Sequence, residues 1–353
     1  MTHITRRRRL GAAVVAIAAF AVLATGCAPQ AAAPEASPSN TPYSGEVTPV
    51  SVALGFLPTV EFAGNFVADA EGYYAEVGIE ASFVPGGPNA PAPEVAIASG
   101  EAQIAYESNT SRLFNYLTEE DDIVVIGRTF QTSPNGLLSL KDKPITSADD
   151  LTGSVIIAGA PNRSSLDALM AINDVTDWTF VPGGADIGAL QGGQGDALLG
   201  FATNQPIALE QQGLKEDEDF YFTTFDKLDY HLLADAIIVS RPFLEENRDV
   251  VVNFLKATAK GWEKAMDDPS AAAELTTSTY AGEQGLNPEQ QTAVLEAQIP
   301  FIRTDSSDEH GLFWLDPQFV QDKVYPSLEA GGATGLPDVA TVIDETVQQD
   351  AQK

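Results

Sequence analysis

The sequence contains one pattern written twice, and this repeat constrains the fold more than any other feature. The pentapeptide FVPGG occurs at residues 83–87 and again at residues 180–184. A related ten-residue stretch follows each copy at a similar distance, GEAQIAYESN at 100–109 and GDALLGFATN at 195–204. Five identical residues at nearly the same offset predict that the chain builds one structural unit twice.

The first copy has the hydrophobic periodicity of alternating strands and helices. Apolar residues alternate over 50–56, which indicates a strand, and recur every four residues over 62–70, which indicates one face of a helix. We expect a second strand at 79–84, a short helix at 93–99 and a third strand at 102–106. A strand-helix-strand-helix-strand unit predicts a parallel sheet with right-handed crossovers.

The second copy repeats this order. Strands are expected at 155–158, 178–181 and 197–201, with a helix over 164–172 between the first two. Ser164 and Asp167 have the spacing of a capping box at the start of that helix. The sequence therefore predicts an α/β protein with two similar lobes in tandem.

Both copies end in an aromatic residue followed, after one position, by a hydroxyl residue and an asparagine. These are Tyr106, Ser108 and Asn109 in the first copy, and Phe201, Thr203 and Asn204 in the second. In open parallel sheets, ligands bind beyond the carboxyl ends of the strands, where both endings are expected. For any single residue, a role in shaping a turn or capping a helix is an equally good interpretation.

The amino-terminal segment has the pattern of an export signal. Four arginines at residues 6–9 precede an uncharged stretch over 10–25, too short for a membrane span and typical of a signal peptide. Residues 24–27, Ala-Thr-Gly-Cys, resemble a bacterial lipobox, which implies that Cys27 becomes a diacylated amino terminus. We expect a signal peptide over 1–26 and a lipidated linker over 27–48, rich in Ala, Pro and Ser. The export route, general secretory or twin-arginine, stays open.

Charge and cysteine content exclude several classes of function. The chain has 19 basic and 50 acidic residues, a net charge of −31, and such an acidic body repels nucleic acid. Its one cysteine cannot form an internal disulfide or a multi-cysteine metal site. We expect no cofactor and no metal.

Three longer segments resemble one family. They read LGFLPTVEFAGNFVADAEGYYAEVGIEASFVPGG at 54–87, LSLKDKPITSADDL at 138–151 and ADAIIVSRPFLEENRDVVVNFLKATAKGWEKAMDDP at 234–269. Their order resembles the substrate-binding proteins of ABC importers, in the branch that takes thiamine-pyrimidine precursors, sulfonates and nitrate and includes the fungal thiamine-pyrimidine synthases.

This resemblance implies a type II periplasmic-binding-protein fold and a monomer that delivers a small molecule to an ABC permease. Lobe 1 would comprise 49–135, lobe 2 would comprise 136–237, and 238–345 would return to lobe 1, leaving a frayed tail at 346–353. Two crossover segments, near 131–140 and 234–240, would join the lobes. The expected motion is hinge closure on a trapped ligand.

The ligand-binding candidates are aromatic and amide residues expected near the strand ends. Gln205 can both donate and accept hydrogen bonds, which suits the edge of a neutral heterocycle such as an aminopyrimidine or a flavin-like ring. Aromatic residues could stack on that ring, although each is equally at home in a core. The full set is Phe56, Phe62, Tyr106, Ser108, Asn109, Gln131, Asn162, Phe201, Asn204, Gln205 and Tyr230.

Two other functions stay open. A small anion such as an aliphatic sulfonate would use Arg112 or Arg163, the cations expected near strand ends. A ligand-binding sensor would bind its ligand in the same way. Catalysis is not expected, because Ser111 stands where the fungal synthases carry their reactive histidine, and His3, His231 and His310 form no catalytic grouping with the residues around them.

Overall fold

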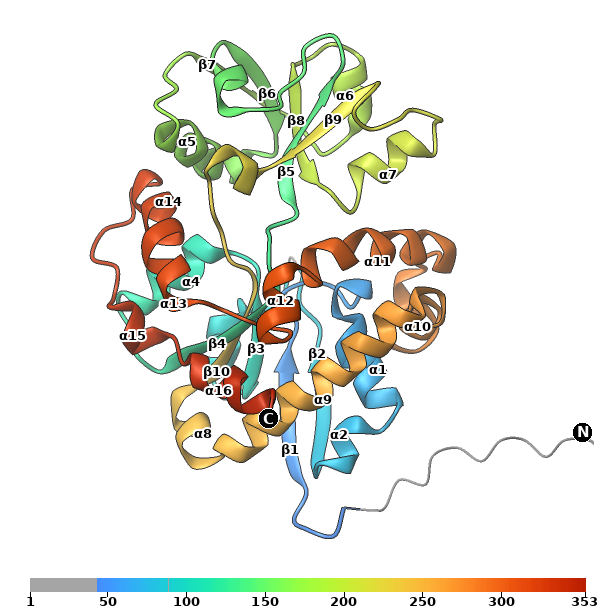
Figure 1. The fold of residues 1–353 in the computed structure, drawn as a ribbon, viewed down its shortest axis with the longest axis vertical. Coiled ribbons are helices and arrows are strands. Elements are labelled where there is room, and N and C mark those ends of the chain that lie inside the picture. Colours follow the sequence, from blue (N-terminus) through green and yellow to red (C-terminus); the bar gives the residue numbers. More distant parts are fainter. Residues whose placement is uncertain (1–42, 88) are drawn as a thin grey trace, which may run out of the picture. The chain divides into compact units, whose positions relative to one another are not determined.

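The computed structural model describes residues 43–87 and 89–353 (Figure 1). Cys27 and the expected signal peptide lie outside these residues. The described residues belong to one unit. Within the described ranges, no helix is both long and apolar enough to cross a membrane.

The strands form two five-stranded sheets. The first sheet has the order β2-β1-β3-β10-β4 and the second has the order β7-β6-β8-β5-β9. The strand bounds are β1 Thr48–Ala53, β2 Ile79–Val84, β3 Ile104–Glu107, β4 Ile123–Phe130, β5 Asn135–Leu140, β6 Ser154–Ala158, β7 Trp178–Pro182, β8 Ala197–Phe201, β9 Phe220–Thr224 and β10 Ala234–Ser240.

The two sheets have the same internal plan. In each, three parallel strands stand in the order second, first, third: β2, β1 and β3 in one, and β7, β6 and β8 in the other. An antiparallel strand then follows, β10 in the first sheet and β5 in the second. Each sheet therefore adds antiparallel strands to the expected parallel unit, and two segments join the sheets as expected. The segments that join the sheets cover only 131–134 and 229–233, because 135–140 and 234–240 are themselves ladder-forming strands.

Helices cover both faces of each sheet. Their bounds are α1 Ala63–Ala70, α2 Tyr73–Glu76, α3 Pro93–Ala98, α4 Thr110–Leu117, α5 Arg163–Ile172, α6 Ile187–Gln191, α7 Gln205–Glu210, α8 Arg241–Glu246, α9 Arg248–Asp267, α10 Pro269–Leu275, α11 Pro288–Ile302, α12 Asp305–His310, α13 Pro317–Phe319, α14 Tyr325–Ala330, α15 Val339–Val342 and α16 Glu345–Ala351. Short 3-10 helices include η1 Val60–Phe62 and η4 Phe225–Leu228.

The long helix α9 lies along α1 and α2 on one face of the first sheet (Figure 1). A glycine makes this close packing feasible, because a Cβ atom on Gly261 would lie 2.0 Å from the carbonyl oxygen of Gly64. Trp262, next to it, is fully buried in the same core cluster. Burial of such large side chains supplies most of the favourable free energy of folding.

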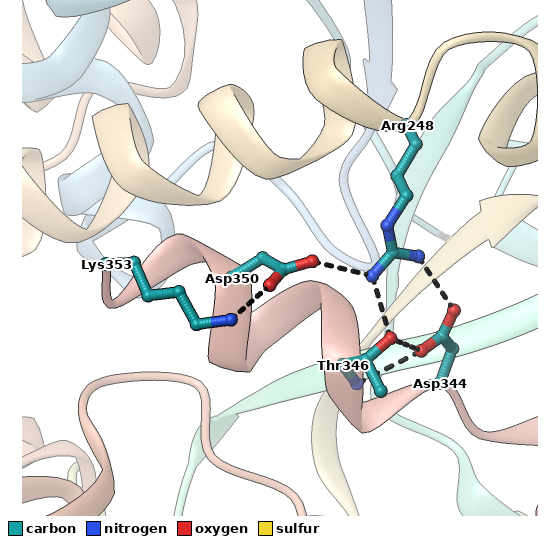
Figure 2. Close-up of polar contacts among 5 residues, drawn as sticks. All are labelled: Arg248, Asp344, Thr346, Asp350 and Lys353. Carbon is teal, nitrogen blue, oxygen red and sulfur yellow. Dashed lines mark hydrogen bonds and ion pairs between the residues drawn. The ribbon is translucent and has the colours of Figure 1, made fainter.

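The carboxyl terminus forms a helix, so the expected frayed tail is wrong. Arg248, at the start of α9, donates hydrogen bonds to Asp344, Thr346 and Asp350, which lie in or just before α16 (Figure 2). Val347 is fully buried in the first core cluster. A nonlocal ion-pair network and two buried side chains, those of Val347 and Gln348, therefore order a segment whose own sequence is polar.

The expected capping box at the start of α5 is also wrong. No side chain caps this helix, which begins at Arg163. Asp167 instead forms an ion pair with Arg163 one turn earlier, with the guanidinium nitrogen 2.9 Å from the carboxylate. Position i+4 on the helix surface favours this pair over a contact with Ser164.

Candidate functional site

The two FVPGG segments both follow the carboxyl ends of equivalent strands, but their turns differ, because Gly87 has a φ of +130° and Gly184 has no positive φ. The Gly86 N–H donates to the Phe56 carbonyl, and the Gly183 N–H donates to the Ala158 carbonyl, both at 2.9 Å. A Cβ atom on Gly86 would lie 2.3 Å from the Leu54 carbonyl oxygen, so this backbone approach requires glycine. The repeat therefore builds two equivalent strand edges.

The asparagines that end the repeat both precede a helix, but only one caps it. The Asn109 side chain accepts a hydrogen bond of 2.9 Å from the Arg112 N–H at the start of α4. Asn204 stands at the matching position before α7 and forms no capping bond. Both residues are exposed, as is Asn162 before α5. Asn204 and Asn162 thus offer side-chain amides at the edge of the second sheet. The side-chain oxygen of Asn109 is instead used to cap α4.

The five aromatic candidates divide into two groups. Phe56, just after β1, and Phe201, at the end of β8, have exposed fractions of 47 % and 46 %. Phe62, Tyr106 and Tyr230 are each 1 % exposed. In this conformation only the two phenylalanines at the strand ends present ring surface to a ligand.

The buried aromatic candidates pack against other rings. Phe62 meets Tyr106 edge to face with ring centroids 5.6 Å apart, and Tyr230 meets Phe225 in the same way at 5.3 Å. These contacts place Phe62 and Tyr106 in the core of the first sheet, and Tyr230 in that of the second.

The two glutamine candidates are buried and bonded to the backbone. Gln205 is 4 % exposed; its Oε1 accepts from the Phe201 N–H at 2.7 Å and its amide nitrogen donates to the Ala185 carbonyl at 3.4 Å. The Gln131 side chain donates to the Trp314 carbonyl at 3.1 Å. Gln205 therefore ties the loop after β7 to the end of β8, next to the exposed Phe201.

Both arginines considered for an anion already have partners. Arg112 forms ion pairs with Glu107 at 2.7 Å and Glu94 at 3.1 Å. Arg163 pairs with Asp167 and lies over the Trp178 and Phe180 rings, 5.0 Å from each centroid. An anionic ligand would have to compete with carboxylates for either cation.

The structure adds two acidic residues that the sequence analysis missed. Asp235 is 2 % exposed at the start of β10 and accepts a hydrogen bond of 2.6 Å from the Ser108 hydroxyl at the end of β3. Glu61, in η1, is the acidic neighbour of Asp235. Burial raises the pKa of Glu61 well above its usual value and that of Asp235 to about 6. The sequence signal was an acid inside the apolar run ADAIIVS.

A search against protein-family descriptions matches residues 59–272 to the family described as NMT1/THI5 like. This match covers more than half of the chain. The chain belongs to the NMT1/THI5-like family. The resemblance inferred from the sequence is thereby confirmed.

Two characterised relatives of the chain are named as binding proteins. The riboflavin-binding protein RibY of Chloroflexus aurantiacus is 28 % identical over 315 residues, covering 84 % of this chain and 86 % of that protein. The formylaminopyrimidine-binding protein of Halalkalibacterium halodurans is 25 % identical over 234 residues, covering 63 % of this chain and 68 % of that protein. Both names agree with the expectation of a binding protein rather than an enzyme.

Solved structures confirm the expected fold class. The periplasmic sulfonate-binding protein SsuA of Methylobacillus flagellatus superposes with a TM-score of 0.61 at 15 % identity, covering 87 % of this chain and 94 % of SsuA. At this identity the likeness establishes the periplasmic-binding-protein fold alone.

Proposed function

We propose that this protein is a lipid-anchored, extracytoplasmic substrate-binding protein that delivers a heteroaromatic molecule to an ABC permease. A flavin such as riboflavin is the ligand we favour, ahead of the thiamine-pyrimidine precursor suggested by the sequence. The observation that carries the ligand class is the pair of exposed phenylalanines, Phe56 and Phe201, at the carboxyl ends of strands in the two sheets. Hinge closure would bring these two edges together on the ligand.

A flat ring suits this arrangement. Aromatic stacking contributes about 0.5–1.5 kcal/mol per pair beyond the burial of area, and a flavin offers two faces to two rings. The relative that binds riboflavin aligns over 84 % of the chain, against 63 % for the relative that binds formylaminopyrimidine. This difference favours a flavin over a single-ring pyrimidine.

A sulfonate is the weaker alternative. Arg112 forms an ion pair with Glu107 in β3, and Arg163 forms one with Asp167 in α5. A sulfonate has no hydrogen-bond donor and needs a cation or free backbone N–H groups. The fold shared with SsuA does not supply these groups, because the same fold serves many ligands.

Anchoring and transport rest on the amino-terminal sequence and on the family. Cys27 follows the lipobox-like stretch and would carry the lipid. The exposed asparagines Asn162 and Asn204, on the second sheet, would read the polar edge of the ring.

Riboflavin titration of the full-length protein in detergent, followed by quenching of flavin fluorescence, tests this proposal. Phe56→Ala and Phe201→Ala should each weaken binding about tenfold, which corresponds to about 1.4 kcal/mol. Val47→Ala is the control, because Val47 is 52 % exposed but precedes β1 at its opposite end. Wild-type protein that binds neither riboflavin nor an aminopyrimidine would refute the ligand class, as would phenylalanine variants with unchanged affinity.

A further inference from the structure

Buried hydrogen-bond acceptors without donors gather at the carboxyl-end edge of the first sheet. Asp235 Oδ1 accepts from Ser108, but Oδ2 has no hydrogen-bond partner among the described residues. Asn65 is fully buried and donates to the Tyr106 hydroxyl at 2.8 Å, while its own Oδ1 has no partner. Buried acceptors of this kind are uncommon in folded proteins and call for an explanation.

The two acids are not neutralised by a basic side chain. Within the described ranges, no lysine, arginine or histidine forms an ion pair with Glu61 or Asp235. Neighbouring carboxyls of this kind share one proton, because mutual repulsion and the burial of Asp235 both oppose a second negative charge. The other titratable group beside them is the phenol of Tyr106, whose pKa burial raises. The pair therefore carries one negative charge and accepts more hydrogen bonds than its surroundings donate.

The backbone holds Asp235 in an unusual conformation. Its φ of +52° lies in the left-handed region, which few residues other than glycine adopt. Strained backbone of this kind persists where the surrounding structure enforces it, often at ligand sites. Here it occurs at the point where the chain enters β10.

This cluster also lies close to the residue that precedes the exposed Phe56. A Cβ atom on Gly55, the preceding residue, would lie 2.6 Å from the Tyr106 carbonyl oxygen and 3.2 Å from the Ser108 Oγ. The ends of β1 and β3 are therefore in contact. Ser108 is exposed and Glu61 is half-buried, so the cluster reaches the surface beside Phe56.

We propose that Glu61, Ser108 and Asp235 form a subsite that binds hydrogen-bond donors of the ligand, either hydroxyl groups or a ring N–H. The ligand is then neutral or cationic and carries at least one such donor, and sulfonates are excluded because they bring only acceptors and a negative charge. The inference rests on the proposed function for the position of the ligand. It adds which chemical groups of the ligand the first sheet recognises. For a flavin, the donors are the hydroxyls of the ribityl chain or the N3–H of the ring.

Three probes distinguish these two donor sources. Riboflavin has both, lumiflavin lacks the ribityl hydroxyls, and 3-methylriboflavin lacks the N3–H. Their affinities for the full-length protein, and for Asp235→Asn and Glu61→Gln, would be measured by fluorescence quenching. Asparagine is chosen at 235 because it also tolerates a positive φ, so the fold is preserved. The same titration at pH 5 and pH 8 adds a second readout.

We expect Asp235→Asn to weaken riboflavin binding at least tenfold with an unchanged melting temperature. The loss should be small for whichever analogue lacks the donor that Asp235 binds. Wild-type affinity should fall from pH 8 to pH 5 as the pair takes up its second proton, and the double variant Glu61→Gln/Asp235→Asn should be insensitive to pH. Equal losses for all three probes together with a lower melting temperature would indicate a structural role and overturn the subsite.

The same panel separates this inference from the proposed function. If wild-type protein binds no flavin, a thermal-shift screen with 4-amino-5-hydroxymethyl-2-methylpyrimidine and ethanesulfonate shows which ligand class binds instead. A pyrimidine whose binding weakens in Asp235→Asn would refute the flavin assignment and support the subsite. Binding of ethanesulfonate, or unchanged affinity for every ligand in Asp235→Asn and Glu61→Gln, would overturn the subsite.

Discussion

Replacement of Gln205 distinguishes its two competing roles. The sequence suggested that its amide reads the ligand, whereas the structure places its Oε1 2.7 Å from the Phe201 nitrogen and its Nε2 3.4 Å from the Ala185 carbonyl oxygen. Gln205→Met keeps the approximate volume of the side chain and removes both hydrogen bonds. If the structural role is correct, this variant loses stability first.

The expected loss follows from the bonds removed. A buried N–H left without an acceptor costs about 1–3 kcal/mol, and the 3.4 Å bond to Ala185 adds little because it is long. Gln205 is 4 % exposed, so water does not readily replace the amide. We expect Gln205→Met to lower the free energy of unfolding by about 2 kcal/mol, a fall in melting temperature of several degrees.

The assay is urea unfolding followed by circular dichroism, with riboflavin affinity measured on the same samples. Gln212→Met is the matched control, because Gln212 is exposed and the same change there should stay within about 0.5 kcal/mol. Affinity should also fall in Gln205→Met, since the Phe201 ring loses its backbone support. Wild-type stability combined with abolished ligand binding would refute this reasoning and return Gln205 to direct recognition.

Two further predictions concern the first sheet. Gly261→Ala should destabilise the protein by about 1–3 kcal/mol in urea unfolding. The new methyl group would lie 2.0 Å from the Gly64 carbonyl oxygen and push α9 away from α1. Unchanged stability would show that the two helices can move apart without cost. Burial, together with the neighbouring carboxyl of Glu94, to which protonated Glu107 can donate, raises the pKa of Glu107 to about 8 even though Arg112 lies beside it. This value is above that of the unfolded chain, so the stability that the group contributes is complete at low pH and is lost as pH rises towards 8. Melting temperatures from pH 5 to pH 9 should therefore decline less in Glu107→Gln than in the wild type, and identical slopes would contradict the assignment.

Much of the local structure could be predicted from the sequence, because local signals mark the strands of the repeat. The strands at Ile79–Val84 and Ala197–Phe201 match the expected ranges, and the short helix Pro93–Ala98 matches within one residue. Each is an apolar run bounded by glycine, proline or a polar turn, so its limits are set by neighbouring residues.

Elements that depend on distant partners were not predicted. The expected crossovers near 131–140 and 234–240 do lie where the chain passes between the sheets, but no local pattern reveals that 135–140 and 234–240 each pair with two strands. The helix α16 forms because Arg248, about a hundred residues earlier, binds its polar side chains. Sequence periodicity reports the character of a segment but not its partners.

The candidate site shows the same limit at the level of single residues. Tyr106 and Phe201 occupy the same position in the repeat, yet one is 1 % exposed and the other 46 %. Tyr106 faces Phe62 and Asn65 within the core of the first sheet, whereas Phe201 ends β8 opposite Asn135. Residue type and repeat position could not separate these cases, because exposure depends on what packs above each strand.

The duplication therefore accounts for the scaffold rather than for its chemistry. Both copies supply a Pro-Gly-Gly segment after a strand and an asparagine before a helix. The residues with chemical character are specific to each sheet: acceptors around Asp235 in the first, and the exposed Phe201 supported by Gln205 in the second. If the proposed function holds, the edge of the first sheet discriminates among ligands by their hydrogen-bond donors, and the edge of the second adds stacking area. Substitutions at Asp235 should therefore change which ligand binds best. Substitutions at Phe201 should lower the affinity for all related flavins by a similar factor.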